Sequence, residues 1–200
     1  SAKRSHDSSA TRYNSLGFRV GFKAVQPDLA NPALELFGGA SVTREASQPW
    51  IDPGFEAHDV RDGILTASVT VSGTLDMNST GTYVLTYSVS DAAGNEANAT
   101  RTVTVTDNTA PVVTLLGDAN FTQTKDVAWV DPGATVTDTL DGNLTNKVTI
   151  SGTVDVNSTG AYVLTYSVSD AAGNEANATR TVTVADTTAQ LNESILRYLK

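Results

Sequence analysis

Cysteine is absent from this chain of 200 residues. Without a thiol there is no disulfide framework, no cysteine nucleophile and no thiolate ligand for zinc or an iron–sulfur cluster. The sequence also has no run of about 18 apolar residues, the length that a membrane-spanning helix requires. It therefore predicts neither a disulfide-stapled scaffold nor a thiol enzyme, and no insertion into a membrane.

Basic residues are scarce as well. The chain has 13 Lys and Arg against 22 Asp and Glu, which gives a formal net charge of −9 at pH 7. Proteins that bind nucleic acid need a basic face to neutralise phosphates, so the charge argues against a nucleic-acid partner. An acidic surface opposes self-association, and we expect a monomer.

One segment of 79 residues is repeated in tandem. The stretch Tyr83–Val105 recurs without a change at Tyr162–Val184, and the same offset holds without a gap between residues 28–106 and 107–185. The two copies are identical at 48 of 79 positions. Solenoid repeats are shorter, about 20–50 residues, whereas a unit of this length can form a small domain of its own. We therefore expect two modules of the same fold.

The distribution of charge separates these modules from the two ends. Residues 1–27 carry five basic residues and one acid, and residues 186–200 carry two of each. Residues 28–106 carry ten acids and three bases, and residues 107–185 carry nine and three. This change in composition near residue 27 indicates a boundary between unrelated units, so we place the domain limits at these four ranges.

Within each copy the hydrophobic residues recur with a period of two. Apolar residues alternate with polar ones through Tyr83–Val89 and again through Ala97–Val105, and Val and Thr dominate both runs. This pattern is typical of half-buried strands, and Asp91–Asn95 predicts the hairpin loop between them. Further strands fit Ala33–Phe37, Gly54–Ala57 and Val69–Gly73. Short strands with regular turn signals predict an all-β fold, a two-sheet sandwich in each copy.

Each copy carries the same ordered set of motifs. Gly81–Leu85 reads G-T-Y-V-L and Gly160–Leu164 reads G-A-Y-V-L, which is similar to the tyrosine-corner segment of an immunoglobulin F strand, with Leu85 where antibody domains have cysteine. The wider pattern W-[IV]-D-P-G, D-G-x-L-T, V-S-D-A-A-G-N and T-R-T-V-T-V resembles the bacterial surface Ig-like family. That family is repeated in many secreted bacterial proteins and includes a domain of a pesticidal crystal protein. The resemblance implies two tandem immunoglobulin-like β-sandwiches without disulfides, at an extracellular or cell-surface location.

The N-terminal 23 residues do not belong to the repeat. Their Arg-rich start and the closing segment Gly17-Phe18-Arg19-Val20 resemble the end of the formylglycine-generating (sulfatase-modifying factor) family. The catalytic cysteines of that family would lie upstream, so the resemblance implies no catalytic residue here. The alternative interpretation is a basic, Ser-rich linker.

The C-terminal end is also outside the repeat. Leu191, Ile195 and Leu199 have the spacing of a short amphipathic helix. Residues 194–200 fit equally well as the first strand of a following domain, and the spacing does not decide between the two.

Acidic residues gather in turn-rich segments of both copies, beside Gly and Pro. Calcium takes about six to eight oxygen ligands, so three carboxylates with loop carbonyls and water can form a site. The alternative is that these Asp residues cap turns and keep the surface charged, and their spacing does not match an EF-hand. We expect no cofactor other than calcium. The calcium candidates are Asp52, Asp59, Asp62, Asp107, Asp131, Asp138, Asp141 and Asp186.

Little in the sequence predicts catalysis. The two histidines are His6 and His58, and position 137, which corresponds to His58, is Thr. Paired acids in a cleft hydrolyse glycosides, but a sandwich this small offers little cleft. Trp50 and Trp129 start a strand within a repeated motif, where packing is a simpler role than sugar stacking. We therefore predict that the chain is not an enzyme.

Two arginines recur on the last strand of each copy. Arg101 and Arg180 share the parity of the core-facing residues. Each can pair with a carboxylate, or its stem can cover apolar surface.

Taken together, these patterns predict non-catalytic spacer modules of a secreted or cell-surface bacterial protein, with adhesion as an additional role. The expected partners are neighbouring domains of the same chain and, for adhesion, a surface glycan or protein. The alternative is a carbohydrate- or protein-binding accessory module of an extracellular enzyme. The loops of the two copies are nearly constant, which favours a duplicated scaffold over diversified binding.

Overall fold

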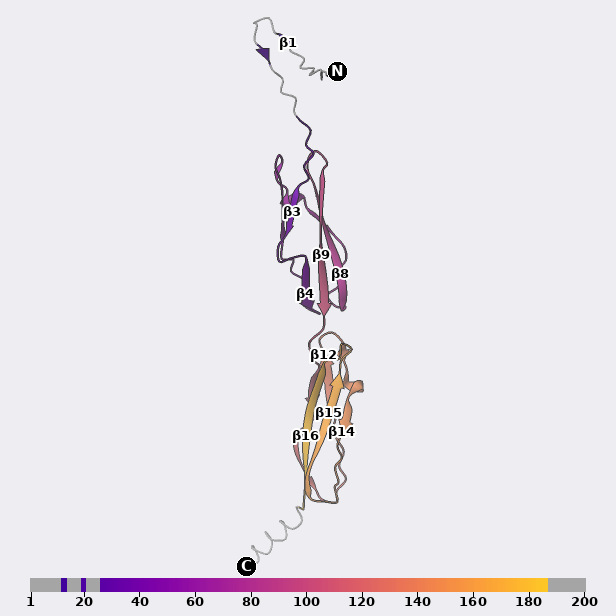
Figure 1. The fold of residues 1–200 in the computed structure, drawn as a ribbon. Helices are drawn as coiled ribbons and strands as arrows, with labels where there is room; N and C mark the ends of the chain where they lie inside the picture. Colours follow the sequence, from indigo (N-terminus) through magenta and orange to yellow (C-terminus); the bar gives the residue numbers. More distant parts are fainter. Residues whose placement is uncertain (1–11, 14–18, 21–25, 187–200) are drawn as a thin grey trace, which may run out of the picture. The chain divides into compact units, whose positions relative to one another are not determined.

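The computed structural model describes residues 12–13, 19–20 and 26–186 (Figure 1). Two successive sets of strands span residues 33–106 and 112–185, and we call them the first and the second module. Among the described residues the helical elements are two short 3₁₀ turns, η1 (Thr66–Ser68) and η2 (Thr145–Lys147). No helix in this part of the chain is long and apolar enough to cross a membrane.

The first module contains seven strands joined by tight turns. They are β3 (Ala33–Leu36), β4 (Ser41–Glu45), β5 (Phe55–Asp59), β6 (Gly63–Ile64), β7 (Thr70–Ser72), β8 (Gly81–Ser90) and β9 (Glu96–Thr106).

The second module repeats every one of these elements at the offset of 79 residues. Its strands are β10 (Val112–Leu115), β11 (Asn120–Thr124), β12 (Ala134–Asp138), β13 (Gly142–Asn143), β14 (Thr149–Ser151), β15 (Gly160–Ser169) and β16 (Glu175–Ala185). The prediction of an all-β fold with two Ig-like repeats is therefore confirmed.

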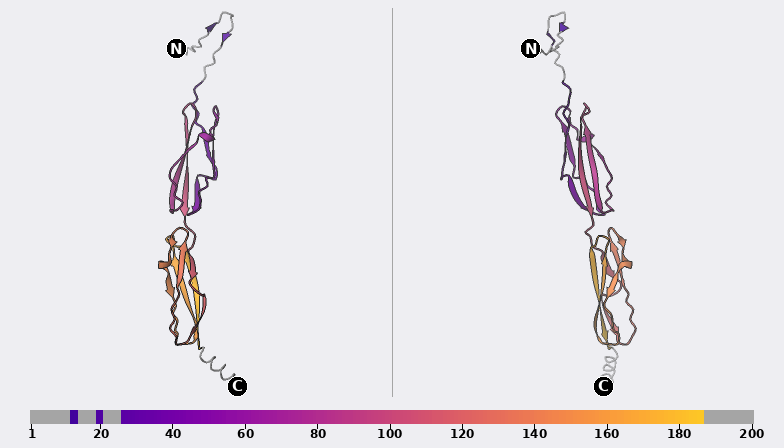
Figure 2. Two further views of the ribbon diagram at one scale, coloured as in Figure 1. Left: turned by 180° about the vertical axis from the view of Figure 1, so that it is seen from behind. Right: turned by 45° about the vertical axis from the view of Figure 1, so that its right-hand side comes forward.

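Each module consists of two sheets (Figures 1 and 2). In the second module a three-stranded sheet has the order β10-β12-β13 and a four-stranded sheet the order β11-β16-β15-β14. The first module repeats this topology as β3-β5-β6 and β4-β9-β8-β7. The long hairpin β15–β16 pairs from Gly160 with Val184 to Ser169 with Glu175, so one antiparallel ladder spans the whole length of the sheet.

An early strand of each module pairs with its last strand in parallel. Ser41 pairs with Thr102 and Glu45 with Thr106, so β4 runs in the same direction as β9. In the second module β11 runs parallel to β16 through five successive pairs. The sequence does not predict β4, because Ser41–Glu45 contains a single apolar residue and lacks the alternation of the longer strands.

The core lies between the two sheets and uses the alternate residues that the period of two indicates. In β8 the side chains of Leu85, Tyr87 and Val89 are buried. The ring of Phe55 meets the ring of Tyr87 edge-on at 5.3 Å between centroids. In the second module the core cluster comprises Val136, Leu144 and Val168, with Val113, Val148 and Ala176 packed against it.

The predicted tyrosine corners are present in both copies. The Tyr83 hydroxyl donates a hydrogen bond to the Ser79 carbonyl at 2.8 Å, and the Tyr162 hydroxyl donates one to the Ser158 carbonyl at 2.9 Å. This contact fixes the chain at the start of the F strand of an immunoglobulin-type sandwich.

The predicted hairpin at Asp91–Asn95 is also confirmed. Its ends are joined by the Asp91 amide, which donates to the Asn95 carbonyl at 3.0 Å. Gly94 adopts a φ of 88°, a conformation that glycine reaches without steric cost.

The two ends of the chain carry predictions that the structure does not test. Residues 12–13 (β1, Arg12–Tyr13) and 19–20 (β2, Arg19–Val20) form a two-stranded antiparallel ladder. The remainder of residues 1–25, where the resemblance to the formylglycine-generating family was expected, lies outside the described residues. The helix or strand expected after Thr188 lies outside them as well.

Candidate functional site

A buried arginine occupies the interior of each module. Arg101 on β9 is completely buried and forms an ion pair with Asp52. Its guanidinium also donates to the carbonyls of Phe37 at 2.6 Å, Gly54 at 3.1 Å and Gly39 at 3.3 Å. The Gly54 carbonyl also accepts the Phe37 amide at 3.0 Å, so the arginine adds to the backbone hydrogen bonds of these loops and anchors them to the last strand.

The second module repeats this anchor with Arg180 and Asp131. Arg180 Nη1 lies 2.7 Å from Asp131 Oδ1, and Nη2 donates to the Gly133 carbonyl at 3.3 Å. The hydroxyl of buried Tyr166 lies 2.6 and 2.7 Å from the two oxygens of the same carboxylate. Burial, followed by this hydrogen bond and the negative charge of Asp131, raises the pKa of Tyr166 to about 12. Of the two roles considered for the arginines, pairing with a carboxylate is the one the structure contains.

Asp52 and Asp131 are therefore held by the arginine anchors. Asp52 also accepts the Gly54 amide at 2.8 Å, and Asp131 accepts the Gly133 amide at 3.1 Å. Each carboxylate thus binds a guanidinium and closes a turn, which accounts for a repeated Asp in the motif W-[IV]-D-P-G without a metal.

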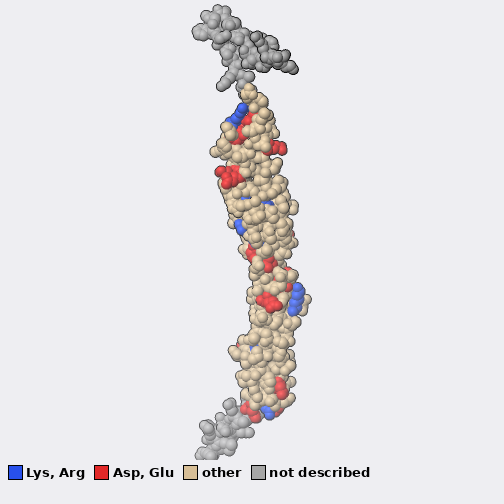
Figure 3. Space-filling view, in the orientation of Figure 1, with Lys and Arg blue, Asp and Glu red and all other residues tan. Residues whose placement is uncertain are grey.

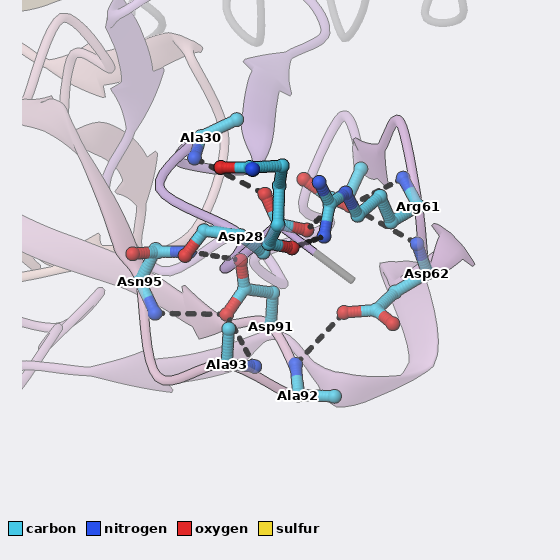
Figure 4. A network of polar contacts seen from close by, with 10 residues as sticks. Asp28, Ala30, Arg61, Asp62, Asp91, Ala92, Ala93 and Asn95 are labelled. Carbon is cyan, nitrogen blue, oxygen red and sulfur yellow. Dashed lines mark hydrogen bonds and ion pairs between the residues drawn. The ribbon is translucent and has the colours of Figure 1, made fainter. Parts of the chain in front are cut away.

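A separate cluster of carboxylates lies at one end of the first module (Figure 4). Asp28 precedes β3, Asp59 ends β5 and Asp91 follows β8. One oxygen from each of the three side chains lies within 4.8 Å of the others. Asp59 and Asp91 are buried, with exposed fractions of 2% and 8%. Three elements that are distant in sequence thus place three negative charges side by side.

Backbone amides hold one oxygen of each buried acid. Asp59 Oδ1 accepts the amides of Arg61 at 2.7 Å and Asp62 at 3.0 Å, and these bonds lower the pKa of Asp59. Asp91 Oδ1 accepts the amides of Ala93 and Asn95. The Asn95 side chain donates to Asp91 Oδ2 at 2.7 Å and contributes most to the lowered pKa of Asp91. Both carboxylates are therefore stabilised in their charged form.

Two further observations concern the surroundings of the cluster. Asp59 Oδ2 is buried and has no hydrogen-bond partner. Arg61 Nε lies 3.5 Å from Asp28 Oδ2, and its side chain is 46% exposed. An open hollow of about 340 Å³ adjoins the cluster, and its lining includes Asp28, Arg61, Asp62 and Ala92.

The second module repeats the three acids as Asp107, Asp138 and Asp170. Asp138 Oδ1 accepts the amides of Leu140 and Asp141, both at 2.8 Å. The Oδ2 atoms of Asp107 and Asp138 are buried without a hydrogen-bond partner. Burial raises the pKa of Asp107, and the charges of Asp138 and Asp170 raise it further, against a hydrogen bond from the Thr109 amide that lowers it. For Asp170, burial raises the pKa but the hydrogen bonds from Asn174 outweigh it, and the pKa is lowered.

The remaining calcium candidates have other neighbours. Asp62 Oδ2 accepts the Ala92 amide at 2.8 Å, and Asp141 Oδ2 accepts the Ala171 amide at 2.6 Å. Asp62 thus connects the turn after β5 to the hairpin loop of the first module, and Asp141 connects the turn after β12 to the hairpin loop of the second. Asp186 is exposed after β16. Metal binding by any of these candidates stays a prediction.

The structure brings in acids that the candidate set lacked. Asp28 and Asp91 complete the cluster of the first module, and Asp170 occupies the position of Asp91 in the second module, although none of the three is among the calcium candidates. The repeat offers a signal for Asp28, because it occupies the position of Asp107 at the offset of 79. Asp91 and Asp170 precede the hairpin glycine, and turn formation alone explains an Asp there.

The face of the described residues drawn in Figure 3 carries charged side chains at separate places. In Figure 3 the acidic side chains occupy several separate places on the visible face, and uncharged residues cover most of it. His58 is exposed on β5. Trp50 is half-buried, and the Arg44 guanidinium lies 5.8 Å from its ring centroid.

Comparison with curated proteins finds two relatives over a little more than half of the chain. An uncharacterized 81.3 kDa protein of Acholeplasma phage L2 is 31% identical over 116 residues, which is 56% of this chain and 16% of that protein. Hyalin of the sea urchin Lytechinus variegatus is 35% identical over 119 residues, 56% of this chain and 22% of that protein. The chain thus spans about a fifth of the length of these relatives or less.

Solved structures share the fold only distantly. The M60 catalytic domain of Clostridium perfringens ZmpB with its CBM51-1 and CBM51-2 domains aligns over 88% of this chain and 33% of that one, with a TM-score of 0.48 and 16% identity. A lipoprotein of Bacteroides thetaiotaomicron aligns over 73% of this chain and 97% of that one, with a TM-score of 0.36 and 21% identity.

The family match covers both modules. Residues 34–105 and 113–184 each match the family described as "Bacterial surface protein, Ig-like domain". These two ranges lie within the two repeats and together comprise most of the chain. The chain belongs to the bacterial surface protein Ig-like domain family.

Proposed function

We propose that the two modules are force-bearing spacers of a secreted or cell-surface bacterial protein, which hold neighbouring domains of the same chain apart. The family match fits a non-catalytic accessory module of a surface protein. The observation that carries the mechanical role is the parallel pairing of an early strand with the last strand, β4 with β9 and β11 with β16.

Parallel pairing determines how each module responds to tension. The chain enters β4 and leaves β9 in the same direction, so tension applied through the two ends of the module slides one strand along the other. Backbone bonds close this ladder at both ends in each copy. The Thr102 amide donates to the Ala40 carbonyl and the Ala46 amide to the Thr106 carbonyl, both at 2.8 Å. Under shear these bonds must break together rather than one after another.

The buried arginines support the same function. Arg101 and Arg180 lie on the last strand of their modules and bind carbonyls of the loops between the early strands. Each arginine therefore joins the first part of its module to the strand by which the chain leaves. Both anchors are retained in copies that differ at 31 of 79 positions, as a repeated mechanical element requires.

Single-molecule pulling of the chain tests this proposal. We expect two unfolding events of similar force, each releasing about 25 nm at roughly 3.5 Å per extended residue. Lys125→Pro removes the amide that donates to the Ala185 carbonyl at 2.9 Å. It should lower the unfolding force of one event and leave the other unchanged.

The matched control is Ala128→Pro, at an exposed position outside the strands. It should leave both forces unchanged. Unfolding at the same low force in the unmodified chain and in Lys125→Pro would overturn the mechanical role.

The competing function is a glycan- or protein-binding accessory module. One observation favours it: an open polar groove of about 580 Å³ in the second module, lined by residues that include Lys147, Ser169, Glu175 and Asn177. No aromatic side chain is part of this lining, although aromatic rings supply much of the contact area in binding sites. A glycan array probed with the chain decides between the two, since saturable binding abolished by Asn177→Ala would establish the accessory role.

A further inference from the structure

The cluster at the end of the first module has an excess of negative charge at close range. Oxygens of Asp28, Asp59 and Asp91 lie within 4.8 Å of one another. Like charges at this separation repel, and a folded protein normally relieves the repulsion with a proton or a cation. Within the described part of the chain, the basic group paired with the cluster is Arg61, with its Nε 3.5 Å from Asp28 Oδ2.

The buried oxygen of Asp59 indicates what the cluster lacks. Asp59 is 2% exposed, its Oδ1 accepts two amides, and its Oδ2 has no hydrogen-bond partner among the residues that the structure describes. Buried carboxylate oxygens are almost always satisfied, because an unsatisfied one loses its hydration without compensation. The two amides donated to Oδ1 favour the charged form of this carboxylate and so disfavour a proton as the missing partner. A cation is left to satisfy this oxygen.

The donor set selects the kind of cation. The cluster offers carboxylate oxygens and contains neither histidine nor cysteine. Oxygen-only sites with several carboxylates suit hard divalent cations, and calcium tolerates irregular geometry completed by water better than magnesium does. The adjoining hollow beside Asp28 and Asp62 leaves room for water ligands and a path from solvent.

We propose that Asp28, Asp59 and Asp91 bind a calcium ion. The ion ties together the segment that enters the module, the end of β5 and the loop after β8. Its binding stabilises the end of the sandwich, independently of the force-bearing role.

The proposal extends to Asp107, Asp138 and Asp170, which occupy the equivalent positions of the second module at the offset of 79 residues. Two of their oxygens, Asp107 Oδ2 and Asp138 Oδ2, are buried without a hydrogen-bond partner. The copies differ at one informative position, since Leu140 stands where the first module has Arg61. The ion pair that neutralises part of the first cluster therefore has no equivalent at that position, and the second site binds calcium more tightly.

Calorimetric titration of the full chain with calcium chloride, after removal of metal by a chelator, measures the binding. We expect two sites with dissociation constants of about 10⁻⁴–10⁻³ M, the range of extracellular calcium modules. Asp59→Asn keeps the shape of the side chain and should remove one site, and Asp138→Asn should remove the other. The matched controls are Asp76→Asn and Asp155→Asn, which change exposed acids in equivalent turns and should keep both sites.

Amide NMR shifts locate the binding and exclude loss through unfolding. In the unmodified chain, calcium should shift the amides of Arg61, Asp62, Ala93 and Asn95, all of which donate to the cluster. In folded Asp59→Asn these shifts should vanish while those of the second module persist. Arg61→Leu reproduces the second module's residue and should tighten the weaker site several-fold.

Three results would overturn the proposal. The first is the absence of heat and of amide shifts up to 10 mM calcium. The second is unchanged binding in the folded Asp59→Asn and Asp138→Asn variants. The third is a higher melting temperature of Asp59→Asn in chelator with no response to calcium, which would identify a shared proton as the missing partner.

Discussion

Arg180 and Asp131 form an ion pair in the interior of the second module, with Nη1 of the arginine 2.7 Å from Oδ1 of the carboxylate. Arg180 is 1% exposed, and the Asp131 side chain is 20% exposed. The pair is completed by the Tyr166 hydroxyl and by carbonyls of the surrounding loops. A charged pair with this many hydrogen bonds holds the loops before β11 and before β12 against the last strand.

Removal of the arginine should be strongly destabilising. Arg180→Met keeps much of the stem but leaves Asp131 in the interior without its guanidinium partner. Breaking a buried pair in this way costs about 3–5 kcal/mol, and we expect the lower end because Asp131 retains Tyr166 and some solvent contact. Urea denaturation of the chain measures the loss in the transition of the second module.

The control for this variant is Lys147→Met, which removes an exposed positive charge in the same module. It should change the free energy of unfolding by no more than about 0.5 kcal/mol. If the two variants were equally stable, the ion pair would be incidental to the fold.

The pair also predicts a change of stability at high pH. The pKa of Tyr166 is raised from an ordinary value of 10.0 to about 12 by burial and by Asp131. Between these values the folded chain retains a proton that the unfolded chain has released, so stability falls as the pH rises from about 10 to 12. Below pH 10 the contribution of this tyrosine is fully present.

Absorbance near 295 nm follows the ionisation. Tyr166 should titrate late in the folded chain, and Tyr166→Phe should reduce the amplitude of the late step by one tyrosine. An unchanged late step in Tyr166→Phe would assign the high pKa to another tyrosine.

The period of two predicts most of the core because a pleated strand directs alternate side chains to opposite faces. Leu85, Tyr87 and Val89 are buried as this pattern indicates. The parallel strand β4 has no such signal, since Val42 is its single apolar residue. Its pairing with β9 depends on the position of the rest of the sheet, which a local pattern does not contain.

The carboxylate cluster could be predicted only in part for a related reason. Asp52 and Asp59 are close in sequence, but strand β5 has five residues and separates its ends by roughly 13 Å at about 3.3 Å per step. Asp52 consequently meets Arg101, whereas Asp59 meets Asp28 and Asp91 from distant segments. Two carboxylates that are close in sequence can be held apart by a strand. Proximity along the chain therefore does not show which acids share a site.

The tyrosine corners provide a matched pair of variants. Tyr83→Phe and Tyr162→Phe each delete one hydroxyl that donates to a carbonyl four residues upstream. Loss of a single hydrogen bond of this kind costs about 1 kcal/mol. Thermal denaturation should show a drop of roughly 4–8 °C for the affected module, and unchanged midpoints in both variants would contradict a stabilising role for the corner.

Two glycines of the second module allow the cost of a steric clash to be measured separately from the cost of backbone strain. Gly152 and Gly173 have φ values of 94° and 91°, which side chains rarely adopt. A Cβ at Gly152 would collide with the Val163 carbonyl oxygen, whereas a Cβ at Gly173 meets nothing within 4 Å. Gly173→Ala should therefore cost only the strain of a left-handed residue, about 1–2 kcal/mol.

Gly152→Ala should cost considerably more, because the colliding atom belongs to the backbone of β15 and can move only with the sheet. Urea denaturation of the two variants measures the difference between their free energies of unfolding. Gly73→Ala and Gly94→Ala provide the same comparison in the first module, where the Val84 carbonyl oxygen is the atom that a Cβ at Gly73 would meet. Equal losses in Gly152→Ala and Gly173→Ala would mean that β15 yields to the added methyl group. In that case the close approach of the loop to β15 would be a consequence of glycine rather than a requirement of the sheet.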